Sequence, residues 1–230
     1  DAPTGTPPTA IGAYLADAAQ RARYDALLDA APAGCPTRVL GALRDAIPAG
    51  DRWPVLMLSH CHGCLRFELA AVAEHLATHG FAIVAPDHAG NSLWEALDGE
   101  NAPFTAETLA MRVADIRFVL DRVLDPTAAE LPASLRGRFD ATRVGMVGHS
   151  FGSVTAGAVA RDDDRIRAVA GLAAPMESPL LPFLVMEDIR VPLLLAVAME
   201  DNTIEEIGND YLRENFENAG SPAWRLDLAD

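Results

Sequence analysis

The chain has 230 residues and a formal net charge of −15 at pH 7, with 50% hydrophobic and 22% charged residues. This length and balance predict a globular domain with a sizeable core rather than a disordered chain. The acidic surface argues against nucleic acid as a partner, because the phosphate backbone repels negative charge. No apolar run reaches the roughly 18 residues that a membrane-spanning helix needs, so no integral membrane segment is predicted.

Residues 1–50 are predicted to be a helical lead-in. Residues 1–8 are rich in Pro, Thr and Gly, which favours an extended start. Apolar side chains then follow helical spacing over residues 9–30, and a Pro- and Gly-containing stretch at 32–36 ends the helix. The chain begins at Asp1 without a signal-peptide pattern, which we interpret as a processed form or a fragment.

Apolar runs and amphipathic stretches alternate through the rest of the chain. The apolar runs predict strands, buried on both faces where the run is continuous, at residues 54–59, 81–85, 142–147, 166–172, 191–198 and 223–228. The amphipathic stretches predict helices at residues 65–79, 105–124, 153–161 and 203–219. Gly80 is predicted as a C-terminal stop, and Thr105 as an N-cap with Thr108 as the second choice. Residues 87–104 are expected to be a loop, 126–140 a short helix and a turn, and the three aspartates at 162–164 a solvated loop.

Strand and helix alternate at least five times, with no internal repeat and no linker. This pattern predicts a single α/β domain over residues 1–230, built on a doubly wound, mostly parallel sheet with helices on both faces.

One motif in this alternation carries chemistry. Residues 148–152 read Gly-His-Ser-Phe-Gly, between a predicted strand and a helix of small residues. A G-x-S-x-G in that setting is typical of the nucleophile elbow, where a serine occupies a sharp strand-to-helix turn. We therefore predict Ser150 as a nucleophile that needs a base, an acid and backbone donors for an oxyanion. The N–H of Phe151, directly after the serine, is one expected donor.

A resemblance extends over residues 50–205. Residues 54–60 (Pro-Val-Leu-Met-Leu-Ser-His) precede a Gly-containing turn and a helix, and residues 79–88 (His-Gly-Phe-Ala-Ile-Val-Ala-Pro-Asp-His) follow. With the elbow, this pattern resembles the hydrolases related to platelet-activating-factor acetylhydrolase and the bacterial predicted dienelactone hydrolases. The resemblance implies an α/β-hydrolase fold whose first strands and C-terminal histidine segment lie outside residues 1–230.

By that resemblance, the second oxyanion donor is the backbone N–H of His62, with Cys61 as the alternative and as a neighbour of the substrate. Cys61 and Cys64 stand where glycines are usual in that group. This C-x-x-C leaves three possibilities open: a local disulfide, a redox pair, or a zinc site with His60 and His62. Five consecutive residues are cramped for zinc, so no metal and no cofactor are predicted. A serine in the elbow, rather than a cysteine, favours an esterase over thiolate lactone opening.

The three cysteines are too few for a disulfide scaffold. Cys35 is interpreted as a packed free thiol or a partner for Cys61 or Cys64. We expect a secreted or periplasmic location, and a cytoplasmic one stays open.

The acid of a triad is expected after the strand at residues 191–198. Asp201 is the predicted acid, and Asn202 and Glu200 are alternatives because the register against relatives is ambiguous. Capping the following helix is the competing role for Asp201 or Asn202.

The base is not evident in this sequence. In the α/β-hydrolase order the histidine comes last, yet all six histidines (60, 62, 75, 79, 88 and 149) precede Ser150. We interpret His60 and His88 as loop-fixing, His75 and His79 as solvent-facing, and His149 as packed beneath the sheet, and a surrogate base at His62 is the alternative. The catalytic histidine is expected beyond Asp230.

Trp94, Phe104 and the apolar, Pro-rich residues 173–190 are candidates to line or cover a substrate pocket, with ordinary packing as the alternative. Together these features predict a serine carboxylic-ester hydrolase that works through an acyl-enzyme on small-molecule or polymeric esters. An acyltransferase or peptidase on the same fold, and a non-catalytic hydrolase-like binding protein, are the alternatives. Oligomeric state is not indicated.

Overall fold

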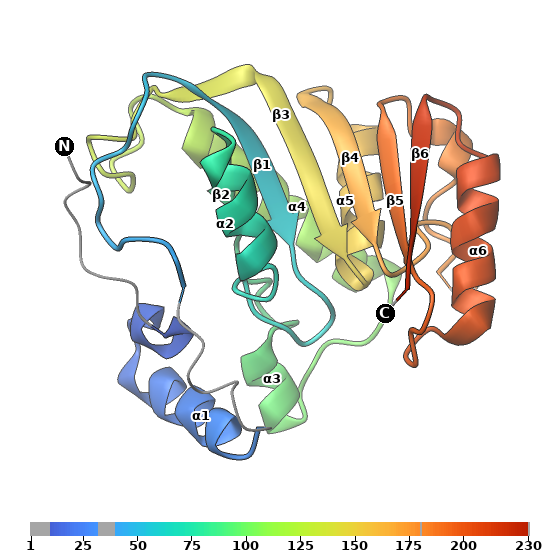
Figure 1. Ribbon diagram of the computed structural model, residues 1–230, viewed down its shortest axis with the longest axis horizontal. Coiled ribbons are helices and arrows are strands. Elements are labelled where there is room, and N and C mark those ends of the chain that lie inside the picture. The colour runs from blue at the N-terminus through green and yellow to red at the C-terminus, as the bar shows by residue number, and fades with distance from the viewer. Residues whose placement is uncertain (1–9, 32–39, 180, 230) are drawn as a thin grey trace.

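A six-stranded parallel sheet forms the centre of the molecule (Figure 1). The computed structural model describes residues 10–31, 40–179 and 181–229, so Cys35 lies outside the described residues. The sheet order is β2-β1-β3-β4-β5-β6, and every neighbouring pair in that order is parallel. The strands are β1 (Trp53–Ser59), β2 (Ala82–Val84), β3 (Phe139–His149), β4 (Ile166–Leu172), β5 (Leu193–Ala198) and β6 (Ala223–Leu228).

Helices lie on both faces of this sheet, as predicted. α4 (Ala106–Leu124), α5 (Phe151–Asp162) and α6 (Glu205–Glu217) share one apolar core with alternate side chains of the strands. α2 (Ala70–Thr78) contacts β2 and lies in front of the sheet in Figure 1, whereas α4 and α5 lie behind it. The predicted doubly wound α/β class is therefore confirmed.

The carboxyl halves of β1 and β3 are largely buried, and their sequence there is apolar on both faces. On β1, Val55 and Met57 are fully buried against the helical core, and Leu58 is buried on the opposite side. β3 pairs with β1 so that Ser59 lies opposite Gly148. The ends of β1 and β3 are thus neighbours at the carboxyl edge of the sheet, where ligand sites of open α/β sheets are found.

Several predicted boundaries hold. The Thr105 side chain accepts a hydrogen bond from the N–H of Thr108, which confirms it as the cap of α4. Gly80 follows α2 with φ +86°, as a helix stop requires. The predicted strands at 166–172 and 223–228 coincide with β4 and β6.

Other expectations were wrong. Residues 126–138 form turns and no helix, and the Asp125 carboxylate accepts the N–H of Thr127 in one of them. The expected loop at 87–104 contains α3 (Leu93–Asp98), which a reciprocal capping box between Ser92 and Glu95 starts.

The N-terminal helix and the aspartate run also differ from expectation. The helix expected over 9–30 is divided into a 3-10 turn η1 (Ile11–Tyr14) and α1 (Ala18–Asp29), because the Asp17 side chain caps a new start. A second 3-10 turn, η2, spans Met186–Asp188. Within the run at 162–164, Asp163 is buried, since Arg165 and Arg117 pair with it. Among the described residues, no helix is both long and apolar enough to span a bilayer.

Candidate active site

The Gly-His-Ser-Phe-Gly motif forms a sharp turn between β3 and α5. Ser150 has φ +54° and ψ −123°, a conformation that side chains rarely adopt, and α5 begins at the next residue. Such strained backbone outside glycine is concentrated at functional sites. A Cβ on Gly148 would collide with the carbonyl oxygen of Gly152, and a Cβ on Gly152 would collide with that of Ser59. Both glycines are therefore required by close backbone approach, and the turn has the geometry of a nucleophile elbow.

The loop after β1 supplies a second set of backbone N–H groups beside this turn. The N–H of Cys61 donates to the carboxylate of Glu68 at 2.8 Å, so it is already occupied. The N–H of His62 makes no hydrogen bond to any described residue. The N–H of Phe151 belongs to the first turn of α5, where helix geometry provides no partner. Of the two donors considered for this loop, His62 is thus the one that remains open.

Aromatic side chains surround these amides. The His62 ring stacks on Phe104 with ring centroids 4.1 Å apart, and Phe104 contacts Phe151 edge-on at 4.9 Å. Phe104 remains 51% exposed, so it offers an apolar surface to solvent next to the elbow. Trp94 has different neighbours. Arg23 of α1 stands over its ring at 5.9 Å and also donates to its carbonyl oxygen. The structure therefore groups Phe104, but not Trp94, with the loop after β1.

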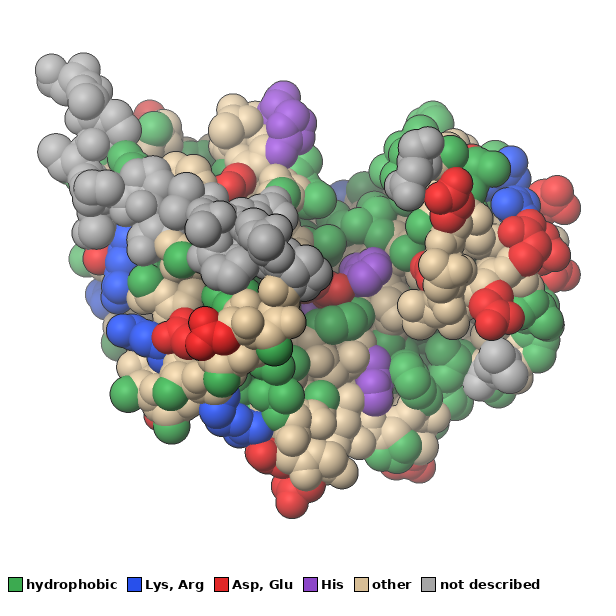
Figure 2. All heavy atoms as spheres, turned by 60° about the horizontal axis from the view of Figure 1, so that its bottom comes forward, with side chains coloured by type: hydrophobic (Ala, Val, Ile, Leu, Met, Phe, Trp, Pro, Cys, Tyr) green, Lys and Arg blue, Asp and Glu red, His purple; other side chains and the backbone are tan. Residues whose placement is uncertain are grey.

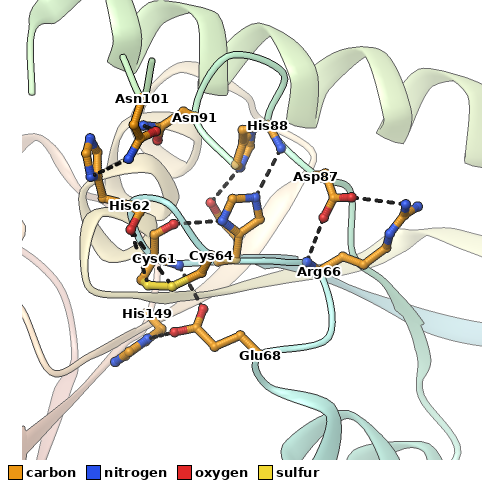
Figure 3. The surroundings of a disulfide bond; sticks show 12 residues. Cys61, His62, Cys64, Arg66, Glu68, Asp87, His88, Asn91, Asn101 and His149 are labelled. Carbon is orange, nitrogen blue, oxygen red and sulfur yellow. Dashed lines mark hydrogen bonds and ion pairs between the residues drawn. A yellow bond between two sulfur atoms is a disulfide. The ribbon is translucent and has the colours of Figure 1, made fainter. Parts of the chain in front are cut away.

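Cys61 and Cys64 form a disulfide with Cα atoms 5.2 Å apart (Figure 3). This bond realises the local-disulfide alternative of the C-x-x-C pattern. It closes the turn that carries His62 and leaves neither sulfur as a thiolate ligand or nucleophile. Glu68 and His149 lie beside the bond in Figure 3, on the side away from His88.

A buried polar network holds the loop after β1 in place. Arg112 of α4 is fully buried, and its guanidinium donates to the hydroxyl of Ser59 at 3.1 Å and to the carbonyl oxygen of His60. It also donates to the side-chain oxygen of Asn91 at 2.5 Å. Burial lowers the pKa of Arg112 to about 9, so the group stays charged at pH 7. One cation thus fixes the end of β1 and the start of the loop.

The network continues to the His62 ring. Asn91 donates to the side-chain oxygen of Asn101 at 2.9 Å, and Asn101 donates to Nδ1 of His62, also at 2.9 Å. Nε2–H of His62 donates to the carbonyl oxygen of Ala102 at 2.6 Å. Both ring nitrogens are therefore engaged in loop contacts, which leaves no support for His62 as a surrogate base.

His60 and His88 are loop-fixing, as interpreted from the sequence. His60 donates from Nδ1 to the Cys61 carbonyl oxygen at 2.7 Å, and its Nε2 accepts the N–H of His88 at 3.0 Å. Nε2 of His88 accepts a hydrogen bond from the Ser59 hydroxyl at 2.9 Å, and Nδ1–H of His88 donates to the Asp115 carboxylate at 3.0 Å. Ser59, His88 and Asp115 have the connectivity of a catalytic triad, but Ser59 and His88 are completely buried. Their arrangement is therefore structural.

The other three histidines also have partners away from the Ser150 hydroxyl. His75 and His79 are exposed on α2 and at its end. His149 is half-buried and donates from Nδ1 to Glu68, rather than packing beneath the sheet. No histidine among the described residues hydrogen-bonds Ser150.

Asp201 lies in the turn between β5 and α6. Its Oδ1 accepts the N–H groups of Thr203 at 2.7 Å and Ile204 at 3.2 Å, which closes the turn before α6. The N-cap of α6 is Ile204 and no side chain caps it, so the helix-capping role considered for Asp201 or Asn202 is wrong. Its Oδ2 accepts no hydrogen bond from the described residues, so one oxygen remains to receive a histidine N–H. A hydrogen bond with Glu68 raises the pKa of His149, and the negative charges of Glu68 and Asp201 raise it further. Asp201 therefore acts electrostatically at the elbow, and its role as the acid stays a prediction.

Residues 173–190 contribute mainly to packing. Met176, Leu184, Met186 and Ile189 are buried in the main core. Asn215 of α6 accepts the N–H groups of Met176 and Glu177, which anchors the segment. Leu181 and Phe183 pack against a second cluster that includes Phe151. Among the described residues of the segment, Leu181 and Phe183 are therefore the ones that pack beside Phe151.

Figure 2 shows the carboxyl edge of the sheet, hollowed between two lobes, with histidine and acidic side chains beside hydrophobic ones near its centre.

A model of the dienelactone hydrolase family matches residues 43–224. The chain belongs to the dienelactone hydrolase family. It is 26% identical over 160 residues to platelet-activating factor acetylhydrolase of Bos taurus and 25% identical over 160 residues to that of Canis lupus familiaris. These alignments cover 55% of this chain and 36% of each relative, so the chain spans about a third of their length.

Solved structures agree with the family. A ferulic acid esterase from Streptomyces cinnamoneus is 26% identical to this chain, with a TM-score of 0.65. The match covers 84% of this chain and 56% of the esterase chain. A dienelactone hydrolase from Anabaena variabilis shares the fold. Its TM-score is 0.58 at 19% identity, and the match covers 80% of this chain and 77% of that one. The resemblance drawn from the sequence, including the α/β-hydrolase fold, is confirmed.

In this dienelactone hydrolase family member, sequence reasoning missed three residues that shape the site. Arg112, Asp115 and Glu68 lie on predicted helices, where a charged side chain indicates a solvated face. Arg112 carried one signal: it falls on the apolar side of its helix, in phase with Leu109 and Ile116, which are buried. Nothing in the sequence distinguishes Glu68 from an exposed glutamate.

The buried histidines predict acid sensitivity of this dienelactone hydrolase family member. Burial lowers the pKa of His60 and of His88 to about 4 in the folded protein, against about 6.5 in the unfolded chain. The unfolded state binds more protons between these values, so this contribution to stability is complete above pH 6.5 and is lost as the pH falls towards 4. The loss is at most about 3 kcal/mol for each ring. Urea unfolding at pH 7.0, 5.5 and 4.5 measures it.

A matched pair of variants isolates this effect. His88→Gln should flatten the rise of unfolding free energy between pH 4.5 and 6.5. His75→Gln, at an exposed ring, should leave that slope unchanged. Equal slopes in wild type and His88→Gln would contradict the assignment.

Proposed function

We propose that this protein hydrolyses carboxylic esters through an acyl-enzyme formed on Ser150. The observation that carries the proposal is the strained backbone of Ser150, placed beside two open N–H groups at His62 and Phe151. Attack by the serine oxygen on an ester carbonyl generates an oxyanion, and two backbone donors in a fixed position stabilise that charge without reorganising. Family membership supports the reaction class.

The rest of the machinery follows from the need for proton transfer. A histidine takes the proton of Ser150 and passes it to the leaving alcohol, and the free oxygen of Asp201 orients that histidine. The six histidines of residues 1–230 are exposed or bonded elsewhere, so the proposed base is a histidine beyond Asp230.

The surroundings favour apolar esters. Phe104 presents an exposed aromatic surface, stacked on His62, next to the donors. Similar proteins are named for ferulic acid and for platelet-activating factor, and both names fit a small ester substrate. The Cys61–Cys64 disulfide supports a secreted or periplasmic location, since such bonds persist in oxidising compartments.

A fluorophosphonate probe tests the proposal, because it labels only serines that an enzyme activates. The full-length protein should gain one probe mass on the peptide that contains Ser150, and Ser150→Ala should gain none. Label on another serine, or no label on a folded full-length protein, would refute the proposal. The second result would favour a hydrolase-like binding protein, the reading suggested by the lack of a histidine bonded to Ser150 among the described residues.

A further inference from the structure

Glu68 joins the two halves of the proposed oxyanion site. Its Oε2 accepts the N–H of Cys61 at 2.8 Å, and its Oε1 accepts Nδ1–H of His149 (Figure 3). Cys61 directly precedes His62, and His149 directly precedes Ser150. One carboxylate therefore bridges the residue before the loop donor and the residue before the nucleophile.

This bridge has two consequences for the donors. Because Glu68 occupies the N–H of Cys61, the next amide along the loop, that of His62, is left to face an oxyanion. Because the other oxygen is tied to His149, the loop cannot shift relative to the elbow without breaking a charge-assisted hydrogen bond. A donor acts well only when it is held close to its catalytic position.

The surroundings strengthen the link. The side chains of Glu68 and His149 are 18% and 31% exposed, so water competes only partly for their contact. The charged groups that act on His149 are Glu68, from the turn before α2, and Asp201, from the turn after β5. Both are acidic and favour a protonated His149. The Cys61–Cys64 disulfide constrains the same loop at its other side.

We propose that Glu68 is a positioning residue that sets the His62 N–H against Ser150 by bridging Cys61 and His149. The inference rests on the proposed ester hydrolysis for its kinetic consequence, but the bridge itself can be measured without activity.

The kinetic test uses the full-length protein and p-nitrophenyl acetate. Glu68→Ala should lower kcat about 10- to 100-fold, somewhat less than the loss of a whole oxyanion donor, with KM nearly unchanged. Glu68→Gln should stay within about threefold of wild type, because both contacts can be kept: its amide oxygen accepts the Cys61 N–H, and its NH2 donates to Nδ1 of neutral His149 protonated on Nε2. Rescue by the amide separates positioning from a requirement for charge.

Glu74→Ala is the matched control. Glu74 also accepts a backbone N–H, that of Ala42 at 2.7 Å, but it contacts neither the loop nor the elbow. Its variant should lose stability comparably and keep kcat. Wild-type kcat in Glu68→Ala, or an equal fall in Glu74→Ala, would overturn the positioning role while leaving ester hydrolysis intact.

Hydrogen exchange and NMR titration test the bridge directly. In Glu68→Ala the Cys61 amide should exchange at least tenfold faster, and the pKa of His149 should fall towards its ordinary value. If the wild type hydrolyses no ester, the proposed function fails. In that case, faster Cys61 exchange still supports the bridge, and unchanged exchange refutes it.

Discussion

Replacing Ser150 by alanine should lower kcat for ester hydrolysis by about 10⁴-fold or more in the full-length protein. The oxyanion donors at His62 and Phe151 are backbone groups and survive the substitution, so weak residual catalysis above the uncatalysed rate is expected. The Ser150 hydroxyl makes no capping hydrogen bond, and its removal should change the unfolding free energy by less than about 0.5 kcal/mol.

Ser150→Gly adds a stability test of the same residue. Glycine adopts φ +54° without a Cβ clash, so this variant should be as inactive as Ser150→Ala but more stable by about 1 kcal/mol. Urea unfolding of the two variants gives the comparison. Equal stabilities would show that the turn is not strained, and activity within tenfold of wild type in either variant would remove Ser150 from the nucleophile role.

Replacing Arg112 by methionine should cost about 3–5 kcal/mol of unfolding free energy, a large fraction of the total for a domain. Methionine fills part of the volume but leaves the carbonyl oxygen of His60 and the side-chain oxygen of Asn91 buried without a donor. It also removes the cation that stands 4.9 Å from the centre of the Phe151 ring. Urea unfolding at pH 7 measures the loss. The full-length variant should also lose activity, because the loop that carries the proposed His62 donor depends on these contacts.

Arg112→Lys separates charge from geometry. An ammonium keeps the charge but cannot donate to Ser59, His60 and Asn91 together, so it should recover only part of the stability. Arg122→Met, at a half-exposed arginine on the same helix, should cost less than about 1 kcal/mol. An Arg112→Met cost below about 1 kcal/mol would contradict a central role for the network.

Features encoded locally could be predicted from the sequence. The strand β4, the Thr105 cap and the Gly80 stop follow from short patterns, and the elbow follows from five consecutive residues. α3 was missed although its capping box, Ser92 with Glu95, was also a local pattern. The helix expected within 126–140 failed because the Asp125 side chain stabilises a turn there.

The site beyond the elbow depends on contacts between distant residues. Arg112 reaches Ser59 and His60 from α4, and Glu68, in the turn before α2, meets His149 at the end of β3. The helical period can place Arg112 on the buried face of α4, but no period or motif identifies the partner of either side chain. The resemblance to relatives placed the His62 amide as a donor, but only the occupied N–H of Cys61 explains why His62 and not its neighbour is open.

The register of β1 against β3 also has a consequence for how the protein folds. β1 pairs along its whole length with β3, from Trp53 opposite Phe139 to Ser59 opposite Gly148, and Gly152 lies against the Ser59 carbonyl. Residues 60–138, which lie between the two strands, therefore have to close as a loop before this pair gains any hydrogen bond, and such long-range pairing slows folding. The loop that carries His62 and the turn that carries Phe151 come together only in that late step. Recovery of activity during refolding should then coincide with the slowest formation of tertiary structure, and no partly folded intermediate should carry an assembled site.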